Sequence, residues 1–177
     1  MKLVYQIPDK LYYIQKFLDS KTYKNIHNSI FKERKNINLK TTKGTWSQKL
    51  IENIIAPKKL DVENYLPFEK LKTLVHRNQF YQLKDVKTIH STIHYMEKGS
   101  GINWHDDNGW TYGATYYINN KWNYQFGGEL MFTSENGHGY IPIVGNSLVI
   151  IKAPLEHKVN PVLSPIIPRV SIQMFIK

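Results

Sequence analysis

The stretch ELMFTSENGHGYIPI (residues 129–143) decides the fold. Two short runs, Glu129–Phe132 and Gly139–Ile143, contain the apolar, β-branched and aromatic residues that favour strands, and Asn136-Gly137 lies between them. Short runs of this kind, bounded by Asn and Gly, are typical of strands separated by turns. The stretch therefore predicts two short β-strands with a turn between them.

The same pattern extends over the second half of the chain. Further strands are predicted at Val86–Tyr95, Tyr112–Ile118, Ser147–Lys152 and Val170–Ile176. Turn signals occur at Asn119-Asn120, Gly127-Gly128 and Gly145-Asn146. Many short strands at nearly regular spacing favour a sandwich or jelly roll.

The first half of the chain has helical spacing instead. Apolar residues recur there at intervals of three and four positions, which predicts four helices. The first follows Asp9 (Leu11, Ile14, Phe17, Leu18), and the second begins at Thr22 (Tyr23, Ile26, Ile30). The third is short (Trp46, Leu50, Ile54) and ends at Pro57, and the fourth follows Pro67 (Phe68, Leu71, Leu74, Val75). Helices followed by strands predict an α+β fold around one core. We expect residues 1–177 to form a single domain, with 1–85 as a helical support region packed against a jelly-roll core at 86–177.

Composition excludes several classes of protein. The chain has 177 residues, of which 41% are apolar and 13% aromatic, as in ordinary globular proteins. No apolar run approaches the length of about 20 residues that crosses a bilayer, and the first residues do not resemble a secretory signal. The chain has no cysteine, which excludes disulfides and thiolate metal sites. We expect a cytoplasmic protein, without a membrane partner, that binds any metal through His, Asp or Glu.

The net charge of +10 is confined to the first half of the chain. Residues 1–90 contain 18 Lys or Arg and 8 Asp or Glu, whereas residues 91–177 contain 6 of each. A solvated, lysine-rich surface explains this asymmetry, and so does a face that attracts an acidic partner such as a nucleic acid.

The hexapeptide WHDDNG (residues 104–109) contains a histidine and two carboxylates in succession. At the end of a strand, His105 and Asp107 point to one side and Asp106 to the other, so the first two side chains could converge on one ion. His157, which follows the predicted strand Ser147–Lys152, is the best third ligand. Two histidines and one carboxylate leave coordination positions open, as in non-haem Fe(II) oxygenases. Packing at the end of a strand is the alternative role for His157.

Arg169 begins the last apolar strand of the chain and is the only basic residue within Val159–Phe175. Arginine is seldom buried unless it is paired, and Ser171 lies two positions along on the same face. A guanidinium beside a hydroxyl is suited to bind a carboxylate in a bidentate manner. An internal salt bridge with Glu129 or Glu156 is the alternative.

Taken in order, these motifs resemble those of a known family. Residues from about 90 to 177 are similar to the catalytic core of Fe(II)/2-oxoglutarate-dependent oxygenases, in particular to the prolyl-4-hydroxylase-like branch. The resemblance rests on Tyr95, His105-x-Asp107, Tyr116-Tyr117-Ile118-Asn119, Trp122, Gly127-Gly128-Glu129-Leu130, Pro142-Ile143-Val144-Gly145, His157 and Arg169-Val170-Ser171.

The resemblance implies a double-stranded β-helix and a set of functional residues. Iron would be held by His105, Asp107 and His157, and the distal carboxylate of 2-oxoglutarate by Arg169, with Tyr95, Tyr117 and Ser171 as helpers. Reaction with O2 would give succinate and CO2, and ascorbate is an additional candidate cofactor. The carboxylate of Asp107 favours hydroxylation, because the halogenating relatives lack this ligand.

The resemblance implies a peptide or protein side chain as substrate, with proline as the first choice. The alternatives are a small molecule or free amino acid, a nucleic acid, and a binding module that has lost catalysis. Arg169 is the last arginine, so the second arginine of nucleic-acid repair relatives has no counterpart, and the complete ligand set argues against lost catalysis. We expect Trp110 or Tyr124 to line the substrate entrance and the first half to determine substrate specificity.

Overall fold

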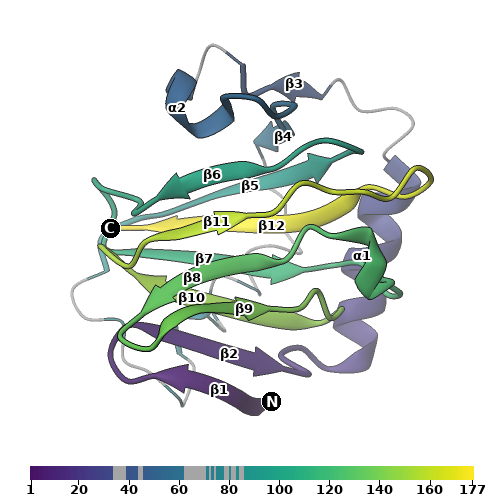
Figure 1. The fold of residues 1–177 in the computed structure, drawn as a ribbon. Coiled ribbons are helices and arrows are strands. Elements are labelled where there is room, and N and C mark those ends of the chain that lie inside the picture. Colours follow the sequence, from purple (N-terminus) through teal and green to yellow (C-terminus); the bar gives the residue numbers. More distant parts are fainter. Residues whose placement is uncertain are drawn as a thin grey trace.

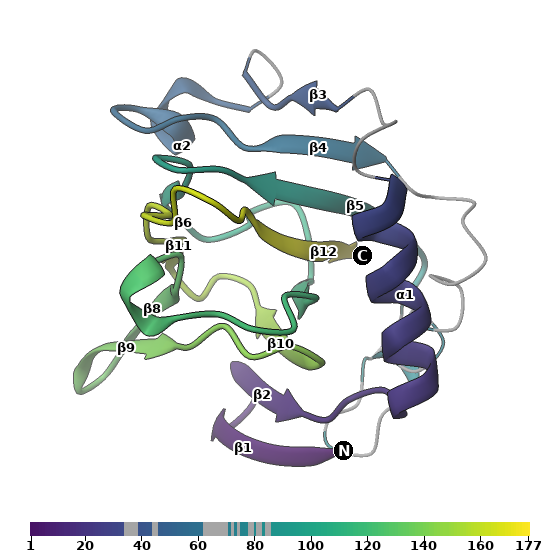
Figure 2. The same ribbon diagram turned by 90° about the vertical axis from the view of Figure 1, so that its right-hand side faces the viewer.

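Two antiparallel β-sheets face each other, and one long helix covers the outer face of the larger sheet (Figure 1, Figure 2). The computed structural model describes residues 1–33, 39–43, 46–61 and 86–177, together with 71, 73, 75–77, 80 and 83. The double-stranded β-helix predicted from the sequence is confirmed. No helix within these described ranges is long and apolar enough to cross a membrane.

The larger sheet combines strands from both halves of the chain. Its order is β1-β2-β10-β7-β12-β5-β4-β3. The bounds are β1 Lys2–Ile7, β2 Leu11–Gln15, β3 Lys40–Thr41, β4 Lys58–Asp61, β5 Ile89–Met96, β7 Tyr112–Tyr117, β10 Ser147–Lys152 and β12 Arg169–Ile176. The four central strands β10, β7, β12 and β5 come from the second half of the chain, and the first half supplies both edges.

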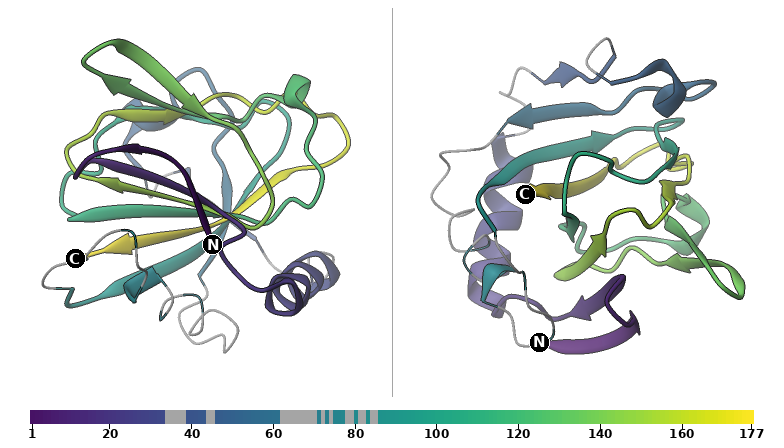
Figure 3. Two further views of the ribbon diagram at one scale, coloured as in Figure 1. Left: turned by 90° about the horizontal axis from the view of Figure 1, so that it is seen from below. Right: turned by 90° about the vertical axis from the view of Figure 1, so that its left-hand side faces the viewer.

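The smaller sheet, in the order β6-β11-β8-β9, covers the inner face of the larger one (Figure 3). Its strands are β6 Ile102–His105, β8 Leu130–Ser134, β9 Gly137–Ile141 and β11 His157–Val159. The stretch from which the fold was predicted forms the hairpin β8–β9. A short 3₁₀ helix, η1 Tyr124–Phe126, precedes β8.

Helix α1, Ser20–Glu33, packs on the outer face of the larger sheet. It begins after Asp19, whose carboxylate accepts hydrogen bonds from the Thr22 backbone nitrogen at 2.9 Å and hydroxyl at 2.6 Å, as an N-cap residue does. Ile26 and Ile30 are buried in one hydrophobic cluster with the outer face of the sheet. The helix predicted from Thr22 is therefore confirmed, and it packs against the β core as expected.

Strand β12 shows how the two faces of the larger sheet differ. Val170, Ile172 and Met174 are fully buried beneath α1. The alternate residues of the strand, among them Arg169 and Gln173, point toward the smaller sheet. Because opposite residues of antiparallel strands share a face, the register of β12 with β5 and β7 assigns the neighbouring side chains to one face or the other.

The helix predicted after Asp9 is wrong, because Leu11–Gln15 form strand β2 between β1 and β10. Leu11 and Tyr13 pack between the two sheets, whereas Ile14 packs beneath α1. A strand that is buried on both faces has no polar alternation, so its apolar residues also matched helical spacing.

The remaining predicted elements are correct in part. Helix α2, Gln48–Ile51, is shorter than the helix predicted from Trp46 to Ile54. Of the helix predicted after Pro67, Leu71 and Val75 are helical, and Phe68 and Leu74 lie outside the described residues. The helical character expected of residues 1–85 is thus only partly right, since this region also forms β1 to β4.

Candidate active site

His105, Asp107 and His157 come together between the two sheets. His105 ends β6 and His157 begins β11, and the two residues lie opposite each other in the ladder of the smaller sheet. Asp107 Oδ1 lies 3.6 Å from His105 Nε2, and Oδ2 lies 3.5 Å from His157 Nε2. One ligand atom from each of the three residues lies within 4.8 Å of the others, a spacing that could hold one metal ion. Within the part of the chain that the structure describes, no other group of this kind occurs.

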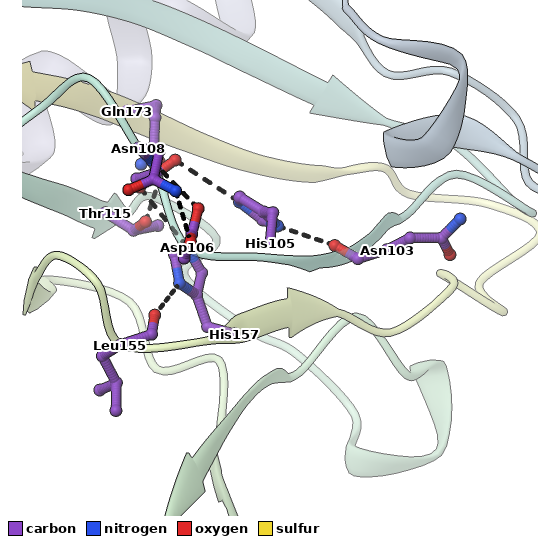
Figure 4. A network of polar contacts seen from close by, with 9 residues as sticks. Asn103, His105, Asp106, Asn108, Thr115, Leu155, His157 and Gln173 are labelled. Atoms are coloured by element: carbon purple, nitrogen blue, oxygen red, sulfur yellow. Dashed lines mark hydrogen bonds and ion pairs between the residues drawn. The ribbon is translucent and has the colours of Figure 1, made fainter.

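Hydrogen bonds to backbone carbonyl oxygens fix the orientation of both imidazoles (Figure 4). His105 Nδ1 lies 2.7 Å from the carbonyl oxygen of Asn103, and His157 Nδ1 lies 2.9 Å from that of Leu155. Each Nδ1 therefore carries the proton and donates it, which leaves the Nε2 lone pairs directed toward Asp107. This arrangement of hydrogen bonds is the usual one for metal-binding histidines.

Burial and the neighbouring His105 lower the pKa of His157, against the opposing effect of Asp107. A lowered pKa keeps the imidazole neutral at physiological pH, and the neutral form is the one that binds metals.

Asp107 is placed by a turn in the chain rather than by strand alternation. It follows the end of β6 with a φ of 53°, a left-handed conformation that is uncommon outside glycine. A Cβ atom at Gly113 would lie 2.5 Å from Asp107 Oδ2, so the carboxylate can occupy its position only above a glycine. Asp106 has a different role, since its carboxylate accepts hydrogen bonds from the backbone and side chain of Asn108.

The donor set fits a metal ion of the Fe(II) type. Imidazole nitrogens with one carboxylate suit iron, and the two imidazoles approach to 4.2 Å between ring centroids. Asp107 Oδ2 is buried and accepts no hydrogen bond from the described residues. Because an unpaired buried oxygen is costly, a cation at this point would stabilise it.

Arg169 lies deeper on the same inner face, with 1% of its surface exposed. Its Nη1 donates to Ser171 Oγ at 3.1 Å and lies 3.3 Å from Met96 Sδ, and its Cζ is 5.1 Å from the ring centroid of Tyr117. Among the described residues no carboxylate pairs with it, so the salt bridge with Glu129 or Glu156 is not found. A buried guanidinium without an anion fits a carboxylate ligand.

Two polar groups at this position, one on Arg169 itself and one on Tyr117, have no hydrogen-bond partner among the described residues. Arg169 Nε and the Tyr117 hydroxyl are buried and have no hydrogen-bond partner within the described ranges. Burial raises the pKa of Tyr117 despite the nearby charge of Arg169, so the hydroxyl stays protonated and can donate. Together with Ser171, these donors fit a bound anion.

The backbone beside Arg169 is held by a buried amide and a glycine. Asn119 donates to the carbonyl oxygen of Pro168 at 2.9 Å and accepts from the Val170 nitrogen at 2.7 Å. Gly128, with a φ of 78°, lies so close that a Cβ atom there would be 3.1 Å from Arg169 Cδ. Asn119 thus holds the backbone on either side of Arg169, and Gly128 leaves room for the arginine side chain.

Tyr95 is not where the prediction expected it. In the ladder it pairs with Val170, and its ring belongs to the hydrophobic cluster beneath α1, on the opposite face of the sheet from Arg169. The face toward Arg169 is instead occupied by Met96 and His94. The family resemblance implied the role of Tyr95, but the register of β5 with β12 contradicts it.

A cavity of about 850 Å³ opens beside the metal-binding residues. It extends between the inner faces of the two sheets and is bounded on one side by the segment that leads into α2. Its aromatic wall includes Trp46, Trp104 and Trp110. Of the two aromatic residues expected at the substrate entrance, Trp110 lines this cavity and Tyr124 does not. A cavity of this size is typical of sites for small ligands or for a side chain of a larger substrate.

Several residues of the site escaped sequence reasoning. The amide of Asn103 donates to the carbonyl oxygens of Lys49 and Glu52, both at 3.0 Å, and so attaches α2 to β6. Gln173 and Thr115 line the cavity, and the Thr115 hydroxyl donates to Gln173 Oε1 at 2.6 Å. Only strand alternation could have indicated Gln173, which shares a face with Arg169.

Two lysines from the basic first half of the chain lie at the site. Lys49 and Lys59 line the cavity. The side chains of Lys32, Arg34 and Lys35 lie outside the described residues.

Comparison with known proteins agrees with this geometry. Residues 91–177 match the family model described as the 2OG-Fe(II) oxygenase superfamily. No curated protein sequence matches the chain.

Three solved structures with the same fold illustrate the range of similar enzymes. A prolyl-4-hydroxylase from Pseudomonas putida has a TM-score of 0.73 at 14% identity, over 95% of this chain and 92% of that one. A prolyl hydroxylase from Trichoplax adhaerens, in complex with a peptide fragment of hypoxia inducible factor, has a TM-score of 0.74 at 17% identity, over 96% and 84%. SnoN, a non-heme alpha-ketoglutarate-dependent epimerase from nogalamycin biosynthesis, has a TM-score of 0.74 at 10% identity, over 96% and 78%. At these identities the likeness establishes the fold.

Proposed function

Because this chain belongs, through residues 91–177, to the 2OG-Fe(II) oxygenase superfamily, we propose that it hydroxylates a peptide or protein side chain, with proline as the first choice. The superfamily uses Fe(II), 2-oxoglutarate and O2. When bound, the iron and the co-substrate supply an oxidation in which 2-oxoglutarate is converted to succinate and CO2 and one oxygen atom enters a substrate C–H bond.

The convergence of His105, Asp107 and His157 is the observation that carries the proposal. Their ligand atoms lie within 4.8 Å of one another, both imidazoles have their Nδ1 protons engaged, and the carboxylate has a buried oxygen without a partner. These three residues would hold Fe(II) on one side and leave the other side open to the cavity. The carboxylate ligand supports hydroxylation rather than halogenation.

Arg169, Ser171 and Tyr117 would hold the distal carboxylate of 2-oxoglutarate. The guanidinium is buried without an anionic partner among the described residues, and the Tyr117 hydroxyl lies beside it without a partner. A carboxylate in this position would accept charge-assisted hydrogen bonds, which are the strongest in proteins. Tyr95 has no part in this site because it lies on the other face of the sheet.

Two observations support a peptide side chain as substrate. The cavity is lined by all three metal-binding residues, so a side chain that enters it can reach the reaction centre. One of the similar structures was solved with a peptide fragment bound. A small-molecule substrate is the second candidate, favoured by a cavity volume that is typical of sites for small ligands and by the likeness to SnoN.

One experiment tests the proposed reaction. The full chain is supplied with Fe(II), 2-oxoglutarate and O2, and candidate peptides with and without proline are added in parallel. We expect succinate to form together with a mass gain of one oxygen on a proline-containing peptide. Coupled succinate formation with a small molecule only would support the second candidate. A failure to form succinate under any of these conditions contradicts the assignment of the chemistry.

A further inference from the structure

Three polar side chains form a row across the inner face of the larger sheet. Thr92 on β5 and Thr115 on β7 each lie opposite Gln173 on β12, and all three line the cavity. The two flanks of this row are aromatic. Trp46 and His94 lie on one side, with a ring separation of 5.4 Å, and Trp110 and Phe175 lie on the other, also 5.4 Å apart.

The amide of Gln173 has one end fixed and the other available. The Thr115 hydroxyl donates to Oε1 at 2.6 Å (Figure 4), which orients the side chain and makes the nitrogen the opposite end. Among the described residues, none accepts a hydrogen bond from Nε2. The amide therefore has N–H donors available to an acceptor in the cavity that Gln173 lines.

The available nitrogen lies next to the proposed iron site. A Cβ atom at Gly113 would be 2.5 Å from Asp107 Oδ2 and 3.8 Å from Gln173 Nε2. The carboxylate and the amide nitrogen thus border the same small volume above Gly113. A substrate whose oxygen is bound by Gln173 Nε2 would therefore lie close to the proposed iron site.

We propose that Gln173 determines specificity by donating a hydrogen bond to the carbonyl oxygen of the tertiary amide that precedes a proline, while the pyrrolidine ring packs against Trp110 and Phe175. This amide accepts hydrogen bonds but has no N–H to donate, so it complements a site that offers a donor. The ring is apolar and complements the aromatic flank. The inference rests on the proposed function and names the group that the site recognises.

The test uses the full chain loaded with Fe(II) and 2-oxoglutarate under anaerobic conditions. The probe is the blocked tripeptide N-acetyl-Ala-Pro-Gly-amide, and its binding is followed by the fluorescence of the cavity tryptophans. We expect Gln173→Leu to weaken binding of this peptide about tenfold, a loss of one good hydrogen bond. Thr115→Val, which only releases the orientation of the amide, should weaken binding less. Both variants should bind 2-oxoglutarate as the unchanged chain does.

Gln15 offers a matched control on the same sheet. Its side chain donates to the Tyr13 hydroxyl at 2.9 Å on β2, and it does not line the cavity. Gln15→Leu should leave peptide binding unchanged. Under aerobic conditions Gln173→Leu should also form more succinate for each hydroxylated peptide, because a poorly held substrate escapes oxidation.

Three outcomes would overturn the inference. They are a normal peptide affinity in Gln173→Leu, a parallel loss of 2-oxoglutarate affinity in that variant, and the absence of peptide binding to the unchanged chain. Each is distinguishable from a failure of the proposed function, because succinate formation and 2-oxoglutarate binding by the unchanged chain are measured separately.

Discussion

The two faces of strand β12 differ completely in chemistry. Toward α1 the strand presents Val170, Ile172, Met174 and Ile176, all fully buried in the outer hydrophobic cluster. Toward the smaller sheet it presents Arg169, Ser171, Gln173 and Phe175, which surround the proposed co-substrate and substrate sites.

This difference separates stability from function within eight residues. The outer face contributes hydrophobic burial, which is the largest favourable contribution to the free energy of folding. The inner face costs free energy, because Arg169 is buried without an anionic partner among the described residues. Substitutions on the outer face should therefore change the free energy of unfolding, and those on the inner face should change ligand affinity.

The largest effect is expected at the carboxylate that joins the two histidines. Asp107→Ala removes the only acidic member of the group and should abolish Fe(II) binding and succinate formation while the fold is retained. Metal content after dialysis and circular dichroism are the measurements. Asp106→Asn is the control and should retain the metal, because Asp106 is hydrogen-bonded to Asn108. Turnover by Asp107→Ala at the normal rate would refute the iron site.

The outer face is tested by Ile172→Ala. The side chain has no exposed surface, so the variant should lower the free energy of unfolding by about 2–5 kcal/mol through lost burial and a cavity. Chemical denaturation measures the change. Ile166→Ala, at a side chain that is 81% exposed, should alter stability by less than about 0.5 kcal/mol. The affinity of folded Ile172→Ala for 2-oxoglutarate should be normal, and a large loss would break the separation between the two faces.

The inner face is tested by Arg169→Ala. A charge-assisted pair contributes about 1.5–3 kcal/mol, so the apparent constant for 2-oxoglutarate should rise at least about tenfold. Steady-state kinetics with varied 2-oxoglutarate gives this constant. Lys152→Ala, at an exposed residue on strand β10 of the same sheet, is the control. If Lys152→Ala or Lys158→Ala raised the constant and Arg169→Ala did not, another cation would bind the co-substrate.

The smallest effect is expected at Asn103, which attaches α2 to β6. Asn103→Ala removes two hydrogen bonds to the carbonyl oxygens of Lys49 and Glu52 and so releases the wall that includes Trp46. We expect KM for the substrate to rise severalfold and the free energy of unfolding to fall by about 1 kcal/mol. Metal content should stay normal, because His105 bonds to the backbone carbonyl of Asn103, which the variant keeps. A normal KM would show that α2 does not shape the substrate site.

Much of the site could be predicted because its residue types are scarce and their order is distinctive. His105, Asp107, His157 and Arg169 were identified in the sequence, and the structure brings the first three together and buries the fourth nearby. The convergence of His105 and Asp107 was predicted from strand alternation, but it depends on the left-handed conformation of Asp107. That conformation has no clear signature in the sequence.

What could not be predicted depends on contacts between distant segments. The face occupied by Tyr95 is set by the register of β5 with β12, and a shift of one residue would reverse it. Gly113 is required only because Asp107 folds over it. Asn103 makes its contacts with residues about fifty positions away, and no local pattern indicates them.

The composition of the larger sheet has a consequence for how the chain folds. Strand β2 pairs with β10, so that Leu11 lies opposite Ile151, and β4 pairs with β5 at the other side. Pairings this distant in sequence form slowly, because a long loop must close before they are stabilised. During synthesis β2 must wait for β10 to emerge from the ribosome. A fragment limited to residues 86–177 would expose the backbones of β10 and β5 as unprotected sheet edges, which promote aggregation. The oxygenase half is therefore expected to fold only together with the amino-terminal strands that close its sheet on both sides.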